Sequence, residues 1–242
     1  GPLLDTIARQ LSVYGVKIDT PLPQGLCDTL AAAVNAASQI RDRFSVDGWA
    51  ALTDMDMSLK RMRPTARAGD DAALATSILL RKAVGFSGLT QDNMYRTAGW
   101  HFLTIGRALE RAAMTAGLLA RWADPAAPDG ALDLALEIGD SMIVHRQRYA
   151  TISSRDSVID LLALDPANPR AVRFQLDVLL DRVTAPALGA QQGLMTDFER
   201  SVRTLQTSFA VHRVETLDTG ALRTALSEVL ALSSTLNTAF LQ

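Results

Sequence analysis

Residues 91–122 (QDNMYRTAGWHFLTIGRALERAAMTAGLLARW) form the longest stretch of the chain with neither a proline nor a polar break. At about 100° per residue, this stretch predicts one long amphipathic helix. One side of that helix would carry small and apolar residues, suited to close helix packing: Phe102, Ile105, Leu109, Ala112, Ala113, Ala116 and Ala120. The other side would mix charges with large apolar residues: Arg96, Trp100, Leu103, Arg107, Glu110, Arg111, Met114, Leu118 and Arg121.

Helical spacing recurs along the whole chain, while the alternation typical of strands is almost absent. We expect further helices over 3–14, 27–44, about 46–60 (capped by Ser45), 71–89, 131–149, 156–164, 169–184, 194–211 and 221–241. The predicted fold is all-α, an antiparallel helical bundle of about eight to ten helices with short connections. We interpret residues 1–24 as a leading helix and linker, and residues 25–242 as the bundle domain.

Composition narrows the possible partners and compartments. Lys and Arg number 24 against 26 Asp and Glu, a net charge of −2, which gives no bulk attraction to nucleic acid or to an anionic membrane. We find no apolar run of about 18 residues and therefore expect no membrane span. The single Cys27 excludes an internal disulfide and fits a cytoplasmic location. Because the chain begins Gly-Pro-Leu, we expect it to be a piece of a longer protein.

Motifs that carry chemistry are missing from the sequence. It contains no phosphate-binding loop, no Gly-x-Gly-x-x-Gly after a strand, no His-Glu-x-x-His and no Glu-x-x-His. The three histidines, His101, His145 and His212, are far apart in sequence. The sequence therefore predicts no catalytic residue, no cofactor and no metal.

A group of arginines surrounds one glutamate on the central helix. Glu110 lies three residues after Arg107 and can pair with it, whereas Arg107 and Arg111, four apart, bring like charges together. If this face is buried, one carboxylate cannot neutralise the arginines. Two interpretations stay open: an internal salt-bridge network completed by acids of other helices, or a recessed site for an anion or a carboxylate-bearing peptide.

A second group of arginines lies in Asn168-Pro169-Arg170 and at Arg173. Arg170 and Arg173 are three apart and would share a face of the helix that Pro169 starts. Cations near a helix start oppose its dipole, so we expect them to pair with something negative. The candidate binding or structural cluster is then Arg96, Trp100, Arg107, Glu110, Arg111, Arg170 and Arg173.

The central residues resemble the bacterial alpha-E family, a helical domain named for a Glu-Arg motif. The resemblance lies in Gly99-Trp100-His101-Phe102, Ile105-Gly106-Arg107 and Leu109-Glu110-Arg111-Ala112. Arg41-Asp42-Arg43 with Trp49, Asp165-Pro166 and Asn168-Pro169-Arg170 support it, and it covers the chain from about Leu26 to the C-terminus. The earlier Gly-Arg and Glu-Arg signature typical of the family is not found in this sequence.

The resemblance implies an accessory role. Alpha-E domains are associated with circularly permuted ATP-grasp ligases, sometimes as fusions, and with transglutaminase-like proteases. The implied function is a non-catalytic interaction domain of an ATP-dependent peptide or amide ligase system, one that helps present a peptide or carboxylate substrate. The alternative is a helical-bundle enzyme or small-anion-binding domain that uses the Arg and Glu cluster, with Glu110 as acid or base. Neighbouring arginines would lower the pKa of Glu110 and make it a poor general acid, which disfavours the alternative.

Overall fold

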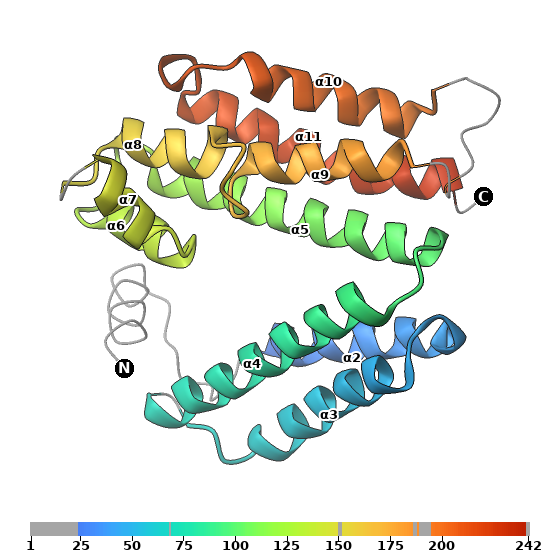
Figure 1. The fold of residues 1–242 in the computed structure, drawn as a ribbon. Helices are drawn as coiled ribbons and strands as arrows, with labels where there is room; N and C mark the ends of the chain where they lie inside the picture. The colour runs from blue at the N-terminus through green and yellow to red at the C-terminus, as the bar shows by residue number, and fades with distance from the viewer. Residues whose placement is uncertain (1–23, 68, 150–151, 186–187, 189–194, 241–242) are drawn as a thin grey trace. The chain divides into compact units, whose positions relative to one another are not determined.

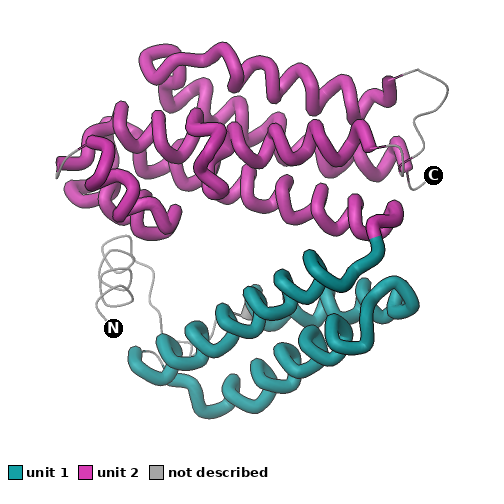
Figure 2. The backbone as a smooth tube through the Cα atoms, in the orientation of Figure 1, with its two compact units in different colours: residues 1–95 teal, residues 96–242 magenta. Residues whose placement is uncertain are grey.

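The computed structural model describes residues 24–67, 69–149, 152–185, 188 and 195–240, and these residues contain helices and no strand (Figure 1). The all-α prediction is confirmed. The expected leading helix over 3–14 and the linker that follows it lie outside the described residues. The chain divides into two compact units, residues 1–95 and residues 96–242 (Figure 2).

In the first unit, the described residues form the α-helices α2 (Gln24–Gln39), α3 (Val46–Met62) and α4 (Asp70–Asn93). As expected, Ser45 caps α3, since its Oγ accepts a hydrogen bond from the Gly48 amide at 3.0 Å. A 3-10 turn, η1 (Arg41–Arg43), joins α2 to α3. A small apolar core holds the unit together: Leu30, Ala37, Leu52, Met55, Leu59, Ala66, Ala75 and Leu79.

The second unit surrounds the long helix α5 (Ala98–Trp122), which packs against α9 (Val172–Val183) and α11 (Thr219–Phe240). Helix α10 (Asp197–Val211) packs against α9 and α11 on the far side from α5 (Figure 1). Shorter elements complete the unit: α6 (Ala131–Ile138), α7 (Met142–Tyr149), α8 (Arg155–Ile159), the π-helical turn η2 (Asp160–Leu164) and the 3-10 turn η4 (Val214–Thr216).

The small apolar face predicted for the central helix packs into the core of the second unit. Ile105, Ala112 and Ala116 are fully buried there, and Leu109 and Ala120 are 6% exposed. Alanine at these positions lets neighbouring helix backbones approach closely. The core continues through residues of the other helices, including Leu136, Ile159, Leu162, Leu176, Phe198 and Leu222.

The prediction of one helix over 91–122 is wrong at its start. Helix α4 runs on to Asn93, the backbone is extended at Met94 and Thr97, and α5 begins only at Ala98. Periodicity could not detect this break, because Met94 is buried and keeps the apolar spacing. Arg96 therefore lies in the connection before α5.

The prediction of one helix over 131–149 is also wrong, because α6 and α7 are separated at Gly139–Ser141. Asp140 has a φ of 48°, a left-handed conformation, and the Ser141 amide donates to the Leu136 carbonyl at 2.8 Å. These bonds close the end of α6. The expected helix from Pro169 likewise begins later, at Val172.

By length and composition alone, α4 could cross a membrane, since an 18-residue window has a mean hydropathy of 1.2 and only 11% of that window is buried. This window differs from the expectation, based on the sequence, of no apolar run of about 18 residues. Lys82, close to the middle of α4, forms an ion pair with Asp54 of α3. A charged pair at that position disfavours the hydrocarbon core of a bilayer, so one such helix is weak evidence for a span.

Gly139→Ala should destabilise the second unit. A Cβ at this position would lie 2.7 Å from Leu162 Cδ2 and 3.1 Å from the Ala135 carbonyl oxygen, and Leu162 is fully buried. We expect a loss of about 1–3 kcal/mol in the free energy of unfolding, measured by urea denaturation. Gly106→Ala is the control, because its Cβ would meet nothing within 4 Å and alanine favours a helix. Equal stability of the two variants would contradict the close approach at Gly139.

Candidate anion-binding site

The turn before α9, residues 165–170 (DPANPR), is held by its own side chains. Asp165 Oδ1 accepts a hydrogen bond from the Ala167 amide at 2.8 Å, and Asn168 Oδ1 accepts one from the Arg170 amide at 3.0 Å. Asn168 Nδ2 donates to the Leu161 carbonyl in η2 at 2.8 Å. Two prolines and these bonds leave the turn little conformational freedom.

Two buried side chains then fix this turn against the neighbouring helices. Thr115 of α5 donates to the Arg170 carbonyl at 2.9 Å, and Gln175 of α9 donates to the Pro169 carbonyl at 2.6 Å. Both side chains belong to residues that are only 2% exposed. As a result the backbone of Arg170 lies beside α5, one helical turn beyond Arg111.

The side chains of three arginines lie near this point, those of Arg107, Arg111 and Arg170. We call them the arginine triad. Burial lowers the pKa of Arg111 below its ordinary value, and the nearby charges of Arg107 and Arg170 lower it further. Among the described residues, one ion pair reaches the triad, from Asp140 Oδ2 to Arg170 Nη2 at 3.7 Å. The Asp140 side chain is 83% exposed, so the triad holds an excess of positive charge on a partly buried face.

Glu110 and Arg173, both predicted for the cluster, lie outside the triad. Glu110 is exposed, and in the described part of the chain no ion pair or hydrogen bond reaches its carboxylate. Arg173 forms an ion pair with Asp177 on α9 at 3.4 Å, and Asp177 also accepts a hydrogen bond from Gln206 of α10. The shared face expected for Arg170 and Arg173 does not form, because Arg170 precedes the helix.

The predicted residues Arg96 and Trp100 meet in a separate group. The Arg96 Cζ atom lies 4.1 Å from the centroid of the Trp100 ring, and the Cζ atom of Arg182, from the last turn of α9, lies 4.9 Å from it. Guanidinium groups at these distances are attracted to the indole face. No sequence pattern pointed to Arg182, since only the packing of α9 on α5 brings it to Trp100.

His101, next in the chain, is 7% exposed, and its Nδ1 has no hydrogen-bond partner within the described structure. Its ring packs edge-on against Trp100, with centroids 5.1 Å apart. Burial lowers the pKa of His101, and the charges of Arg182 and Arg96 lower it further, against an opposing effect from Asp181. The imidazole is therefore held in its neutral form.

The comparisons with known proteins agree with this fold. Residues 7–241 match the family Alpha-E, described as a predicted alpha-helical domain with a conserved ER motif. The chain belongs to the Alpha-E family. It contains two Glu-Arg dipeptides, Glu110-Arg111, whose arginine belongs to the triad, and Glu199-Arg200 in α10. No solved structure matches it.

Two relatives of this Alpha-E domain are "Uncharacterized protein Rv2567" of Mycobacterium tuberculosis and "Uncharacterized protein Mb2597" of Mycobacterium bovis. Each is 26% identical to it over 231 residues. The match covers 91% of this chain and 26% of each relative. The chain thus spans about a quarter of the length of the relatives it matches.

Sequence reasoning missed a buried histidine–serine pair in the Alpha-E domain. His145 Nε2 lies 2.7 Å from Ser157 Oγ, and the two residues are 1% and 7% exposed. Ser157 also forms the capping box of α8 with Ser154. Twelve residues separate the pair in sequence, so no spacing rule pointed to it. The buried pair joins α7 to the start of α8, and we assign it a structural role.

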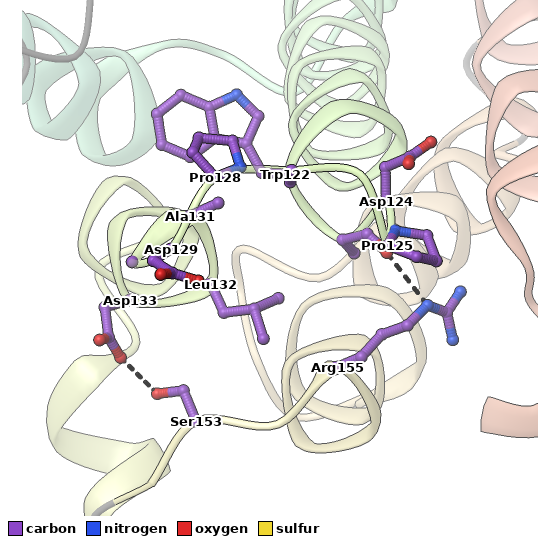
Figure 3. Close-up of a pocket in the computed structure, with 13 residues that line it drawn as sticks. Trp122, Asp124, Pro125, Pro128, Asp129, Ala131, Leu132, Asp133, Ser153 and Arg155 are labelled. Atoms are coloured by element: carbon purple, nitrogen blue, oxygen red, sulfur yellow. Dashed lines mark hydrogen bonds between the residues drawn. The ribbon is translucent and has the colours of Figure 1, made fainter.

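A surface pocket of about 280 Å³ lies beyond the C-terminal end of α5 (Figure 3). Trp122, Pro128, Asp129 and the linked pair Asp133 and Ser153 line it, as does Arg155, which donates to the Ala123 carbonyl at 3.1 Å. Every predicted cluster residue lies outside its lining. In the described residues no group of three or more His, Cys, Asp or Glu could hold a metal ion.

Stability measurements distinguish two interpretations of the arginines on α5: an excess of positive charge, or a structural salt-bridge network with Glu110. Arg111→Met removes one of three like charges and keeps the length of the side chain, so we expect the midpoint of thermal unfolding to stay unchanged or to rise. Glu110→Ala should change the free energy of unfolding by less than about 1 kcal/mol, because Glu110 is exposed. A loss of more than about 2 kcal/mol in either variant would indicate a structural network.

Acidification should destabilise the domain near neutral pH. Burial is the main cause that lowers the pKa of both His101 and His145 below the ordinary 6.5. Below about pH 6.5 the unfolded chain then binds more protons than the folded chain, so stability falls as the pH falls. Each histidine contributes up to about 1.4 kcal/mol per pH unit. Urea midpoints measured from about pH 7.5 to 5.5 test this, and His145→Gln should reduce the slope. Stability that rises on acidification would contradict it.

Proposed function

We propose that this chain is a non-catalytic accessory domain of an ATP-grasp-type peptide or amide ligase system, and that the arginine triad binds a carboxylate of the substrate. The observation that carries this proposal is the excess of guanidinium groups at Arg107, Arg111 and Arg170. Desolvating like charges together is costly unless an anion joins them. The planar fork of a guanidinium group matches a carboxylate in charge and shape.

The way the turn is built supports a binding role for Arg170. The buried polar side chains of Thr115 and Gln175 donate hydrogen bonds to the turn and hold the Arg170 backbone close to α5. A fixed backbone places the guanidinium group near its binding position before a ligand arrives, which lowers the entropy cost of binding. An ordinary surface arginine needs no such support.

The ligase part of the proposal rests on the family resemblance and on length. The relatives are about four times as long as the matching region, so a domain like this one is joined there to other parts. We expect the partner to be a circularly permuted ATP-grasp ligase, fused or separate, with a transglutaminase-like protease as a further partner. We expect the system to work in the cytoplasm, without nucleic acid or membrane.

The same triad supports a second candidate function, the binding of a small inorganic anion such as phosphate. Neighbouring guanidinium groups suit either ligand. An enzyme with Glu110 as acid or base has less support, because that carboxylate is exposed and apart from the triad.

The double variant Arg111→Met/Arg170→Met tests the site. We expect the affinity of the double variant for the single-carboxylate peptide Ac-Gly-Ser-Glu-Gly-Ser-NH2, measured by NMR titration, to fall by about tenfold or more. Arg146→Met, which removes one exposed charge on α7, is the control and should bind normally. Unchanged affinity in the double variant would overturn the site, and competition by phosphate but not peptide would favour the small anion.

A second assay tests the ligase system itself. Adding the chain to the purified ATP-grasp ligase should raise its turnover of an acidic peptide, and the double variant should not. A rate that the chain leaves unchanged would contradict the accessory role.

A further inference from the structure

The seam between α5 and α9 carries positive charge at both ends. The two helices run antiparallel and side by side (Figure 1). Arg170, just before α9, contacts Thr115 of α5, whereas Arg182, at the end of α9, lies over Trp100 near the start of α5. We call this line of contact the α5–α9 seam. The arginine triad marks one end, and Trp100 with Arg96 and Arg182 marks the other.

Both ends face the same side of α5. On a helix with about 100° per residue, Trp100, Arg107 and Arg111 fall within a sector of about 40°. Leu103 and Thr104, half-buried residues, lie between them. With a rise of about 1.5 Å per residue, Trp100 is about 10 Å along the axis from Arg107 and about 16 Å from Arg111.

Each end already holds an exposed aspartate of the chain itself. Asp140, 83% exposed, approaches Arg170, and Asp181, 65% exposed, pairs with Arg182. Exposed ion pairs of this kind are weak, so an incoming carboxylate can replace either aspartate.

We propose that the α5–α9 seam binds an extended acidic peptide, with one carboxylate at the arginine triad and a second at Arg182 beside Trp100. This rests on the proposed function and names its substrate class. An extended chain spans about 3.3–3.5 Å per residue, so the two acidic residues lie about three to five residues apart. The α5–α9 pair thus selects a peptide by its charge and by the spacing of its two acidic residues.

Two peptides of identical composition test the spacing without any change to the protein. Ac-Glu-Gly-Ser-Gly-Glu-NH2 places its glutamates four residues apart, whereas Ac-Glu-Glu-Gly-Ser-Gly-NH2 places them side by side. We expect the separated isomer to bind about tenfold more tightly, measured by NMR titration. Equal affinity would overturn the proposal, because net charge alone would then explain binding.

Arg182→Met tests the second end. We expect this variant to lose about tenfold in affinity for the separated isomer and nothing for the single-glutamate peptide Ac-Gly-Ser-Glu-Gly-Ser-NH2. Arg182→Lys should recover part of the loss, since it restores the charge but not the planar fork. The midpoint of thermal unfolding of Arg182→Met, compared with that of the unaltered chain, shows whether this variant is folded.

The outcomes separate this inference from the proposed function. If the single-glutamate peptide depends on Arg111 and Arg170 while Arg182→Met binds the separated isomer normally, the triad stands and the second end fails. If the affinity for neither peptide depends on Arg111 and Arg170, the proposed function itself is wrong.

Discussion

The close packing of α5 against α9 and α11 is the constraint on which the second unit depends. Ala112 and Ala116 are fully buried at this contact, and larger side chains there would force the helices apart. Because one face of α5 is committed to the core, its other face must carry the charges. The antiparallel neighbour α9 then decides which residues join them, Arg170 at one end and Arg182 at the other.

The arginine triad illustrates how a fold can hold an unfavourable local arrangement. Like charges on Arg107, Arg111 and Arg170 repel, and burial removes part of the water that would screen them. The turn at 165–170 holds Arg170 in place through bonds to Thr115, Gln175 and η2. Stability gained in the core offsets this local cost. Arrangements of this kind are typical of binding sites, where the ligand supplies the missing charge.

Helix periodicity predicted the fold well and the breaks poorly. The all-α class, the cap at Ser45 and the small face of the central helix follow from local pattern, and the structure has them. The break at Met94–Thr97 does not, because the buried Met94 preserves the apolar spacing. The break at Gly139–Ser141 does not either, since a backbone hydrogen bond from the Ser141 amide to the Leu136 carbonyl closes α6 there. At Gly139 the deciding fact is a contact with Leu162, more than twenty residues away in sequence.

Local sequence patterns are enough to predict that the chain is helical, that its central helix has two unlike faces, and that Arg107 and Arg111 share one of them. A residue's place on a helix depends only on its own neighbours in the chain. Packing between helices brings Arg170 and Arg182 to that face, keeps Glu110 and Arg173 apart from it, and buries Trp100. Those outcomes depend on which helices pack together and at what register, and residues distant in sequence set that register.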